Sequence, residues 1–124
     1  AGFRTFRQVE EKVRFLFLAD YAIDYDPKAV QKVLAKNGGE GYAALSETLP
    51  RLRDLSDWTA DAIEKLIHAV CEKKAVQIGA IAQPLRVAVT GSTISPSIHD
   101  TLALLGRERT AARIERCLKL QGAG

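Results

Sequence analysis

Prolines, glycines and an Asn-Gly pair divide the chain into short segments, most of which place apolar residues at helical spacing. The segment from Thr5 to about Asp20 shows the pattern at steps of three and four, in Phe6, Val9, Val13, Leu16 and Phe17. A chain of 124 residues that is 47% apolar and 27% charged can bury a core of its own. We therefore expect an all-α fold.

Two motifs in the first half predict helix ends. Asp26 followed by Pro27 is a good N-cap and first helical residue, because aspartate accepts from first-turn amides and proline needs no donor there. Asn37-Gly38-Gly39 can adopt the left-handed backbone that ends a helix. A third helix is expected over 40–49, with Pro50 starting another turn or kinking the path.

A break at 56–58 divides the chain near residue 55. Thr59 is expected to cap the helix that follows, whose apolar residues at i, i+3, i+4 and i+7 are Ile63, Leu66, Ile67 and Val70. The sequence therefore predicts two small helical subdomains, 1–55 (lacking its N-terminal part) and 56–124.

The stretch from Leu85 to Val89 is open to two interpretations. Its alternation and its valines favour a strand. Pro84 as the first residue of a helix and Gly91 as its end favour a helix, and a lone strand would leave its backbone donors unsatisfied. We favour the helix.

Ser95-Pro96 is the clearest helix start in the chain, because serine can accept from first-turn amides and proline needs no donor. The helix that follows is expected to end at Gly106, and the last helix to run from Arg107 to about Leu120. On that last helix we expect Ala111, Ile114 and Leu118 to be buried and Arg109, Arg113 and Arg116 to lie on the other side.

Catalytic and metal-binding groups are hard to find. His68 and His99 have no Cys or Ser placed as an evident nucleophile, so we interpret both as packing or surface residues. Cys71 and Cys117 are too far apart for a zinc pair and are expected to be reduced, buried apolar fillers. We expect no catalytic residue, metal ligand or cofactor in this chain and, without an apolar run of ~20 residues, no membrane contact.

Positive charge gathers near the C-terminus, where residues 76–124 account for the whole net charge of +3. One interpretation is an ordinary solvated helix face. The other is a phosphate-facing surface that includes Arg86, Arg109 and Arg113. The second gains weight from the small polar loop 91–95, which leads into a helix start whose amides can donate to phosphate or base oxygens.

A capped turn of this kind suits single-stranded RNA better than duplex DNA. Pro96 lacks an N–H, so the amides of Ser97 and Ile98 would be the donors. Unpaired bases can be splayed out and read along their Watson–Crick edges by backbone donors and small hydroxyls. The following helix offers Ser, His, Asp and Thr, which makes it a poor reader of a DNA groove. We therefore predict an RNA partner and no DNA.

Several segments resemble the bacterial glutamyl-tRNA synthetases. The segments are IGAIAQPLRVAVTG at 78–91, Ser95-Pro96, LLGRERT at 104–110, RIER at 113–116, EKVRFLF at 11–17 and Trp58-Thr59, in the family's order. The resemblance implies the anticodon-binding helical region of a class I aminoacyl-tRNA synthetase, with two helical subdomains. It also implies that 85–89 is helical.

The same resemblance implies roles for individual residues. The turn at 95–98 would contact the first two anticodon bases, partly through main-chain groups. Arg4 would read the third base; an arginine there resembles enzymes that charge only glutamate tRNA, and the alternative is an ordinary surface arginine. Arg86, Arg109 and Arg113 would attract phosphates whatever the sequence.

The family's ATP-binding signatures, a His-x-Gly-His-type element and a Lys-Met-Ser-Lys-type loop, are missing here. The resemblance therefore implies a fragment of a longer glutamate–tRNA ligase that binds tRNA and does not catalyse, with ATP and Mg²⁺ used by the parent enzyme. We expect a cytoplasmic monomer. The alternative function is a helical protein-interaction module, whose apolar groove docks a partner helix.

Overall fold

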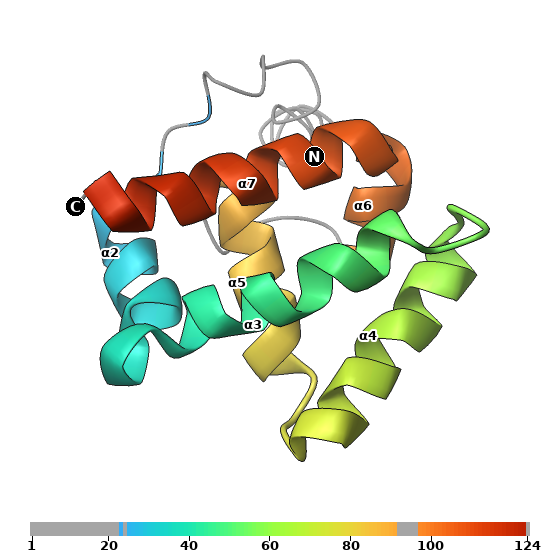
Figure 1. Cartoon of the computed structure of the whole chain (residues 1–124), viewed down its shortest axis with the longest axis horizontal. Coiled ribbons are helices and arrows are strands. Elements are labelled where there is room, and N and C mark those ends of the chain that lie inside the picture. Colours follow the sequence, from blue (N-terminus) through green and yellow to red (C-terminus); the bar gives the residue numbers. More distant parts are fainter. Residues whose placement is uncertain (1–22, 24, 92–96, 124) are drawn as a thin grey trace, which may run out of the picture.

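A computed structural model describes residues 23, 25–91 and 97–123, with the side chains of 121–123 left aside. This part of the chain is helical and contains no strand, which confirms the predicted all-α class (Figure 1). Its elements are α2 (Pro27–Ala29), the π-helix η3 (Val30–Leu34), α3 (Lys36–Arg53), α4 (Ala60–Lys74), α5 (Gly79–Thr90), α6 (Ile98–Leu105) and α7 (Arg107–Ala123). The helix predicted over 5–20 lies outside the described residues.

The predicted helix ends in the first half are confirmed. Asp26 is the N-cap of α2, where its carboxylate accepts from the Lys28 amide at 3.2 Å and Pro27 is the first residue. Asn37, Gly38 and Gly39 have φ values of 51°, 79° and 103°, so the chain turns sharply before the regular part of α3 begins. Pro50 lies inside α3, which continues to Arg53.

The predicted start of α4 and the predicted ends of α5 and α6 are also confirmed. The Thr59 hydroxyl accepts from the Ala62 amide at 3.1 Å and caps α4. Gly91 and Gly106 end α5 and α6 at φ values of 86° and 96°, which suit glycine.

Two predicted helix starts are wrong. Residues 85–89 are helical, but α5 begins at Gly79 and Pro84 lies inside it. The missing proline N–H therefore falls one turn into the helix. The N-cap of α6 is Ser97, two residues after the predicted Ser95, and its side chain makes no capping hydrogen bond. Sequence motifs gave the right elements here, with the wrong first residue.

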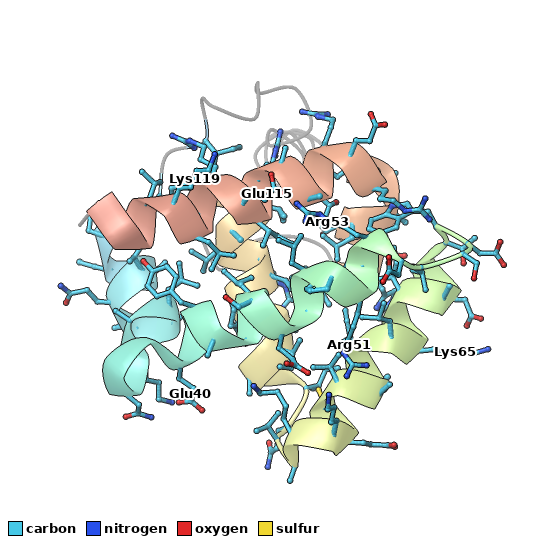
Figure 2. All side chains as sticks on the ribbon, in the orientation of Figure 1. Glu40, Arg51, Arg53, Lys65, Glu115 and Lys119 are labelled. Atoms are coloured by element: carbon cyan, nitrogen blue, oxygen red, sulfur yellow. The ribbon has the colours of Figure 1, made fainter. Side chains whose placement is uncertain are left out.

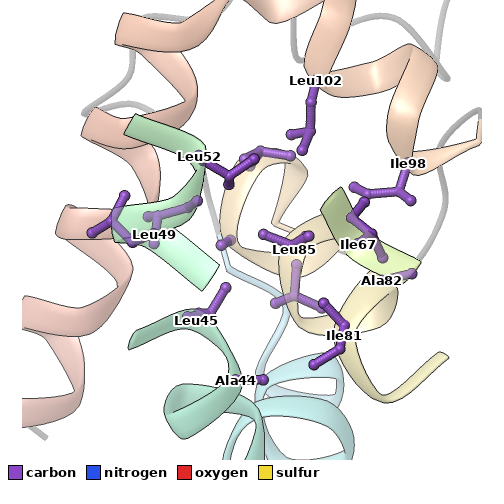
Figure 3. Close-up of a cluster of buried hydrophobic side chains, with 14 of the residues drawn as sticks. Ala44, Leu45, Leu49, Leu52, Ile67, Ile81, Ala82, Leu85, Ile98 and Leu102 are labelled. Carbon is purple, nitrogen blue, oxygen red and sulfur yellow. The ribbon is translucent and has the colours of Figure 1, made fainter. Parts of the chain in front are cut away.

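A single cluster of buried apolar side chains joins the helices (Figure 3). It includes Leu45 and Leu52 of α3, Ile67 of α4, Leu85 of α5 and Leu102 of α6. Helix α5 is central, because it packs against η3, α3, α4, α6 and α7. The division into 1–55 and 56–124 stays a prediction, and helices from both sides of residue 55 share this cluster.

Polar contacts fix the segment between α3 and α4. The Trp58 indole Nε1 donates to the Leu102 oxygen at 2.8 Å, and the Arg107 guanidinium lies 5.5 Å from the Trp58 ring centroid. Arg107 also donates to the Leu55 oxygen, while Arg53 of α3 pairs with Glu115 of α7 (Figure 2). Trp58 is therefore a packed residue.

Candidate nucleic-acid interface

A cavity of about 350 Å³ lies where α4, α5 and the start of α6 meet. Three residues proposed from the sequence line it: Arg86 of α5, with Ser97 and Ile98 at the start of α6. The rest of the lining is Glu64, Ile67, His68, Ile78, Gly79, Ala82, Gln83 and His99. The fold thus brings an arginine and a helix start, separate in sequence, around one space.

Helix α5 supplies two polar side chains to this cavity. Gln83 and Arg86 are one turn apart and half-buried, and both line the cavity together with the core residue Ala82. The Oε1 atom of Gln83 and the Nε atom of Arg86 are shielded from solvent and have no hydrogen-bond partner. A buried acceptor and a buried donor therefore stand unpaired on one face of one helix.

The start of α6 presents main-chain groups. The first hydrogen bond of the helix runs from the Thr101 amide to the Ser97 oxygen at 2.9 Å, so the amides of residues 98–100 have no acceptor within the helix. The Ser97 hydroxyl donates to Oδ2 of Asp100 at 2.5 Å. Ile98 is only 4% exposed, and its side chain belongs to the core. Its amide is therefore not an exposed donor, in contrast to the prediction from the sequence. Only the part of Ile98 that lines the cavity can touch a ligand.

Sequence reasoning missed the rim of this cavity. The Glu64 carboxylate lies 3.5 Å from His99 Nε2, which joins α4 to α6, and 3.9 Å from His68 Nε2 on its own helix. Glu64 and His68 share a helix face at i and i+4, but no sequence pattern places that face opposite α6. The two histidines, interpreted from the sequence as packing or surface residues, both line the cavity.

The expectation that Arg113 faces phosphate is wrong. Arg113 is fully buried, and its Nη1 donates to the Val89 oxygen at 2.7 Å. Arg116 donates to the Ile23 oxygen at 2.8 Å and lies 5.3 Å from the Tyr25 ring centroid. The buried face of α7 contains Thr110, Arg113, Ile114 and Cys117, so it is rotated from the predicted face, and Arg113 ties α7 to α5.

The roles of four other predicted contact residues stay predictions. Arg109 is half-buried on α7, and its phosphate contact stays a prediction. Arg4, Ser95 and Pro96 lie outside the described residues, so their roles also stay predictions.

A second cavity, of about 250 Å³, lies between η3, the start of α3 and the start of α5. Its lining includes Lys32, Lys36 and Glu40, and it shares Gly79 and Gln83 with the first cavity. Gln83 therefore stands between the two spaces.

The thiols are not poised for chemistry. Cys71 and Cys117 are free and buried, as predicted. Burial raises the pKa of Cys71 and raises that of Cys117 to about 12, so both stay protonated at neutral pH. Among the described side chains, no three His, Cys, Asp or Glu residues gather as metal ligands, and no helix in this part is long and apolar enough to cross a bilayer.

Comparison with known proteins identifies the fold. The family model of the anticodon binding domain matches residues 1–118. The chain therefore belongs to the anticodon binding domain family, in agreement with the resemblance seen in its motifs.

The relatives are enzymes much longer than this chain. It is 42% identical over 116 residues to a glutamate–tRNA ligase of Thermus thermophilus, an alignment that covers 94% of this chain and 23% of the relative. It is 34% identical over 115 residues to the glutamate–tRNA ligase of Thermodesulfovibrio yellowstonii, covering 93% of this chain and 24% of the relative. The chain thus spans about a quarter of the length of these relatives.

A solved structure shows the same arrangement of helices. The crystal structure of a glutamate tRNA ligase from Elizabethkingia meningosepticum superposes with a TM-score of 0.79 at 26% identity, covering 90% of this chain and 21% of that one.

Proposed function

We propose that this chain binds the anticodon loop of a glutamate tRNA, as the anticodon-binding part of a glutamate–tRNA ligase. Membership of the anticodon binding domain family supports the class of ligand. The names of the longer relatives support the isoacceptor and the ligase.

The larger cavity is the observation on which this proposal depends. Arg86, Ser97 and Ile98 line it together, although residues 87–96 separate Arg86 from Ser97 in the sequence. A space of about 350 Å³ can admit an unstacked base, and RNA is read with sequence specificity mainly where bases are unpaired. Ile78, which is 44% exposed, offers apolar surface to a base, and the polar side chains of Gln83 and Arg86 line the same cavity.

Roles for the remaining residues follow from the same proposal. The turn at 95–98 would contact the first two anticodon bases and Arg4 the third. Arg86, because of its charge, would also attract the backbone, and Arg109 would contribute phosphate attraction that is blind to sequence. Arg113 has no such role here, because it is buried.

The parent enzyme would join glutamate to tRNA in the cytoplasm, using ATP and Mg²⁺ in a part of the protein that this chain does not include. The residues of this chain do not fit an ATP-binding site, because the two ATP-binding signatures are missing. This chain would act as a monomer, and its task would be recognition.

A titration tests the proposal. The chain is added to a fluorescent anticodon stem–loop of glutamate tRNA, to the same stem–loop with a different anticodon, and to a DNA duplex. We expect the first to bind at least tenfold more tightly than the other two. Equal binding of both loops, or no binding, would favour the protein-interaction module, and preference for the duplex would favour DNA binding.

A further inference from the structure

The short segment before α2 is bound to the end of α5. The Tyr25 hydroxyl donates to the Ala88 oxygen in the last turn of α5 at 2.9 Å. The Asp26 amide donates to the oxygen of Gly91, the C-cap of α5, at 2.8 Å. Ile23, Tyr25 and Asp26 are not helical, so these bonds connect an irregular stretch of backbone to a helix that lies far away in the sequence.

The same segment is bound to α7. Arg116 donates through Nη1 to the Ile23 oxygen at 2.8 Å, and its guanidinium lies 5.3 Å from the Tyr25 ring centroid. A hydrogen bond from a charged donor is stronger than one between neutral groups, and the ring adds a cation–π contact. Ile23, Tyr25 and Asp26, with these partners on α5 and α7, form what we call the Tyr25–Arg116 clamp.

Two elements that we propose to read bases join the described fold at this clamp. Arg4, the proposed reader of the third anticodon base, precedes Ile23 in the chain, and the turn at 95–98, the proposed reader of the first two, follows Gly91. Arg4 and residues 95–96 lie outside the described residues. Ile23 and Gly91 are described, and both accept hydrogen bonds within the clamp. The clamp therefore holds the points at which the two elements are attached.

Two contacts with one ligand strengthen each other when the protein holds them at the spacing that the ligand requires. The first contact then places the second at a high effective concentration, and less freedom is lost on binding. When the spacing is no longer held, each contact keeps its own affinity and only the mutual gain is lost. This loss distinguishes a positioning role from a structural one, because a structural defect weakens every ligand alike.

We propose that the Tyr25–Arg116 clamp is a positioning device for anticodon recognition. Tyr25 and Arg116 are its positioning residues: they set the spacing between the reader of the third base and the reader of the first two. Neither side chain lines the larger cavity, so neither acts there as a contact residue. This inference rests on the proposed function.

The test uses the whole chain and three RNAs. These are the glutamate anticodon stem–loop, the same loop with an abasic third anticodon position, and the same loop with the first two positions abasic. Arg116→Met removes both contacts of the guanidinium and keeps an unbranched side chain. It should weaken binding of the intact loop about tenfold relative to the control, and should leave both abasic loops unchanged relative to it, because each of them engages one reader only.

Lys119→Met is the matched control for charge. Lys119 is exposed on the same helix, so its substitution also removes one positive charge from α7, and general attraction of RNA should fall equally for all three loops. Circular dichroism at the temperature of the titration checks that each variant is folded.

Tyr25→Phe is the second variant, and it changes no charge. It removes the hydroxyl that donates to Ala88 and keeps the ring beside Arg116. The same pattern is expected at a smaller size, about threefold on the intact loop and none on the abasic loops. This variant decides the matter if Arg116→Met does not fold.

The outcomes separate the clamp from the function on which it rests. If the wild-type chain does not distinguish the cognate loop from one with a changed anticodon, the proposed function fails and the clamp has nothing to position. If the wild type does distinguish them, two results reject the clamp alone. One is an equal loss of affinity for all three loops relative to the control, and the other is unchanged binding of the intact loop.

Discussion

The buried guanidinium of Arg113 donates a hydrogen bond of 2.7 Å to the main-chain oxygen of Val89, which joins the middle of α7 to the last turn of α5. Val89 belongs to the same helix as Arg86, which lines the cavity. Arg113, which the sequence suggests is an RNA contact, therefore links two helices instead.

Arg113→Ala should reduce stability rather than RNA contact. The substitution removes a large buried side chain and leaves the Val89 oxygen unpaired, at a cost of about 2–4 kcal/mol in the free energy of unfolding. Urea denaturation measures this. Arg109→Ala, at a half-buried position on the same helix, should cost less than about 1 kcal/mol. An unchanged urea midpoint for Arg113→Ala, with weakened RNA binding, would restore the phosphate role.

Gly41→Ala should open the contact between α3 and η3. A Cβ at Gly41 would lie 2.2 Å from the Val33 oxygen and 2.6 Å from the Leu34 Cα, and both are backbone atoms that cannot rotate away. We expect a loss of about 3 kcal/mol, measured by urea denaturation. At Gly79, a Cβ meets nothing within 4 Å, so Gly79→Ala should be neutral or stabilising by up to about 1 kcal/mol. Equal effects at both glycines would contradict the packing described here.

Alkaline pH should destabilise the chain through Cys117. Burial raises the pKa of this thiol from 9.0 to about 12 in the folded state, so above pH 9 the unfolded chain loses a proton that the folded chain keeps. Stability is therefore complete below pH 9 and falls as pH rises towards 12, by up to about 1.4 kcal/mol per pH unit.

Cys117→Ala isolates that contribution. Under reducing conditions its destabilisation relative to wild type should shrink by about 1.4 kcal/mol between pH 8 and pH 10, because the variant has no thiol to titrate. Burial is the largest cause that raises the pKa of Tyr25, and that part cancels in the difference; the smaller part due to Cys117 is lost with the thiol and belongs to the effect that is measured. A gap that stays constant with pH would show that Cys117 titrates normally in the folded chain.

Thr59→Ala should loosen the first turn of α4. The lost cap leaves the Ala62 amide without its side-chain acceptor and should cost about 1 kcal/mol in the free energy of unfolding. Thr59→Ser keeps the hydroxyl and should retain most of the stability. If the serine variant is as unstable as the alanine variant, the methyl group of Thr59 matters and the hydrogen bond does not.

Local chemistry explains what the sequence predicted well. Asp26-Pro27, Asn37-Gly38-Gly39, Thr59 and Gly106 act within one helical turn of themselves, through a cap or a left-handed backbone, and the structure has all four where expected. The helical state of 85–89 was favoured for a tertiary reason, the lack of a partner strand.

Tertiary contacts explain the sequence-based predictions that were wrong or incomplete. Arg113 shares its helix face with Ile114 and Cys117, and a period of 3.6 residues leaves the exact buried face uncertain by about one residue. Its burial depends on the Val89 carbonyl, which no local pattern reveals. In the same way, the sequence identified Arg86 and the turn at 95–98 separately, and only the packing of α5 against α4 and α6 adds Gln83 and Glu64 to them.

The most direct test of the account observes the cavity itself. In the NMR spectrum of the ¹⁵N-labelled chain, addition of the cognate anticodon stem–loop should shift the Arg86 Nε–H, the Gln83 side-chain amide and the Ser97 main-chain amide, and the loop with a changed anticodon should shift them far less. Shifts confined to Lys32 and Lys36 at the smaller cavity, or to the exposed face of α7, would contradict the claim that anticodon bases enter between α4, α5 and α6.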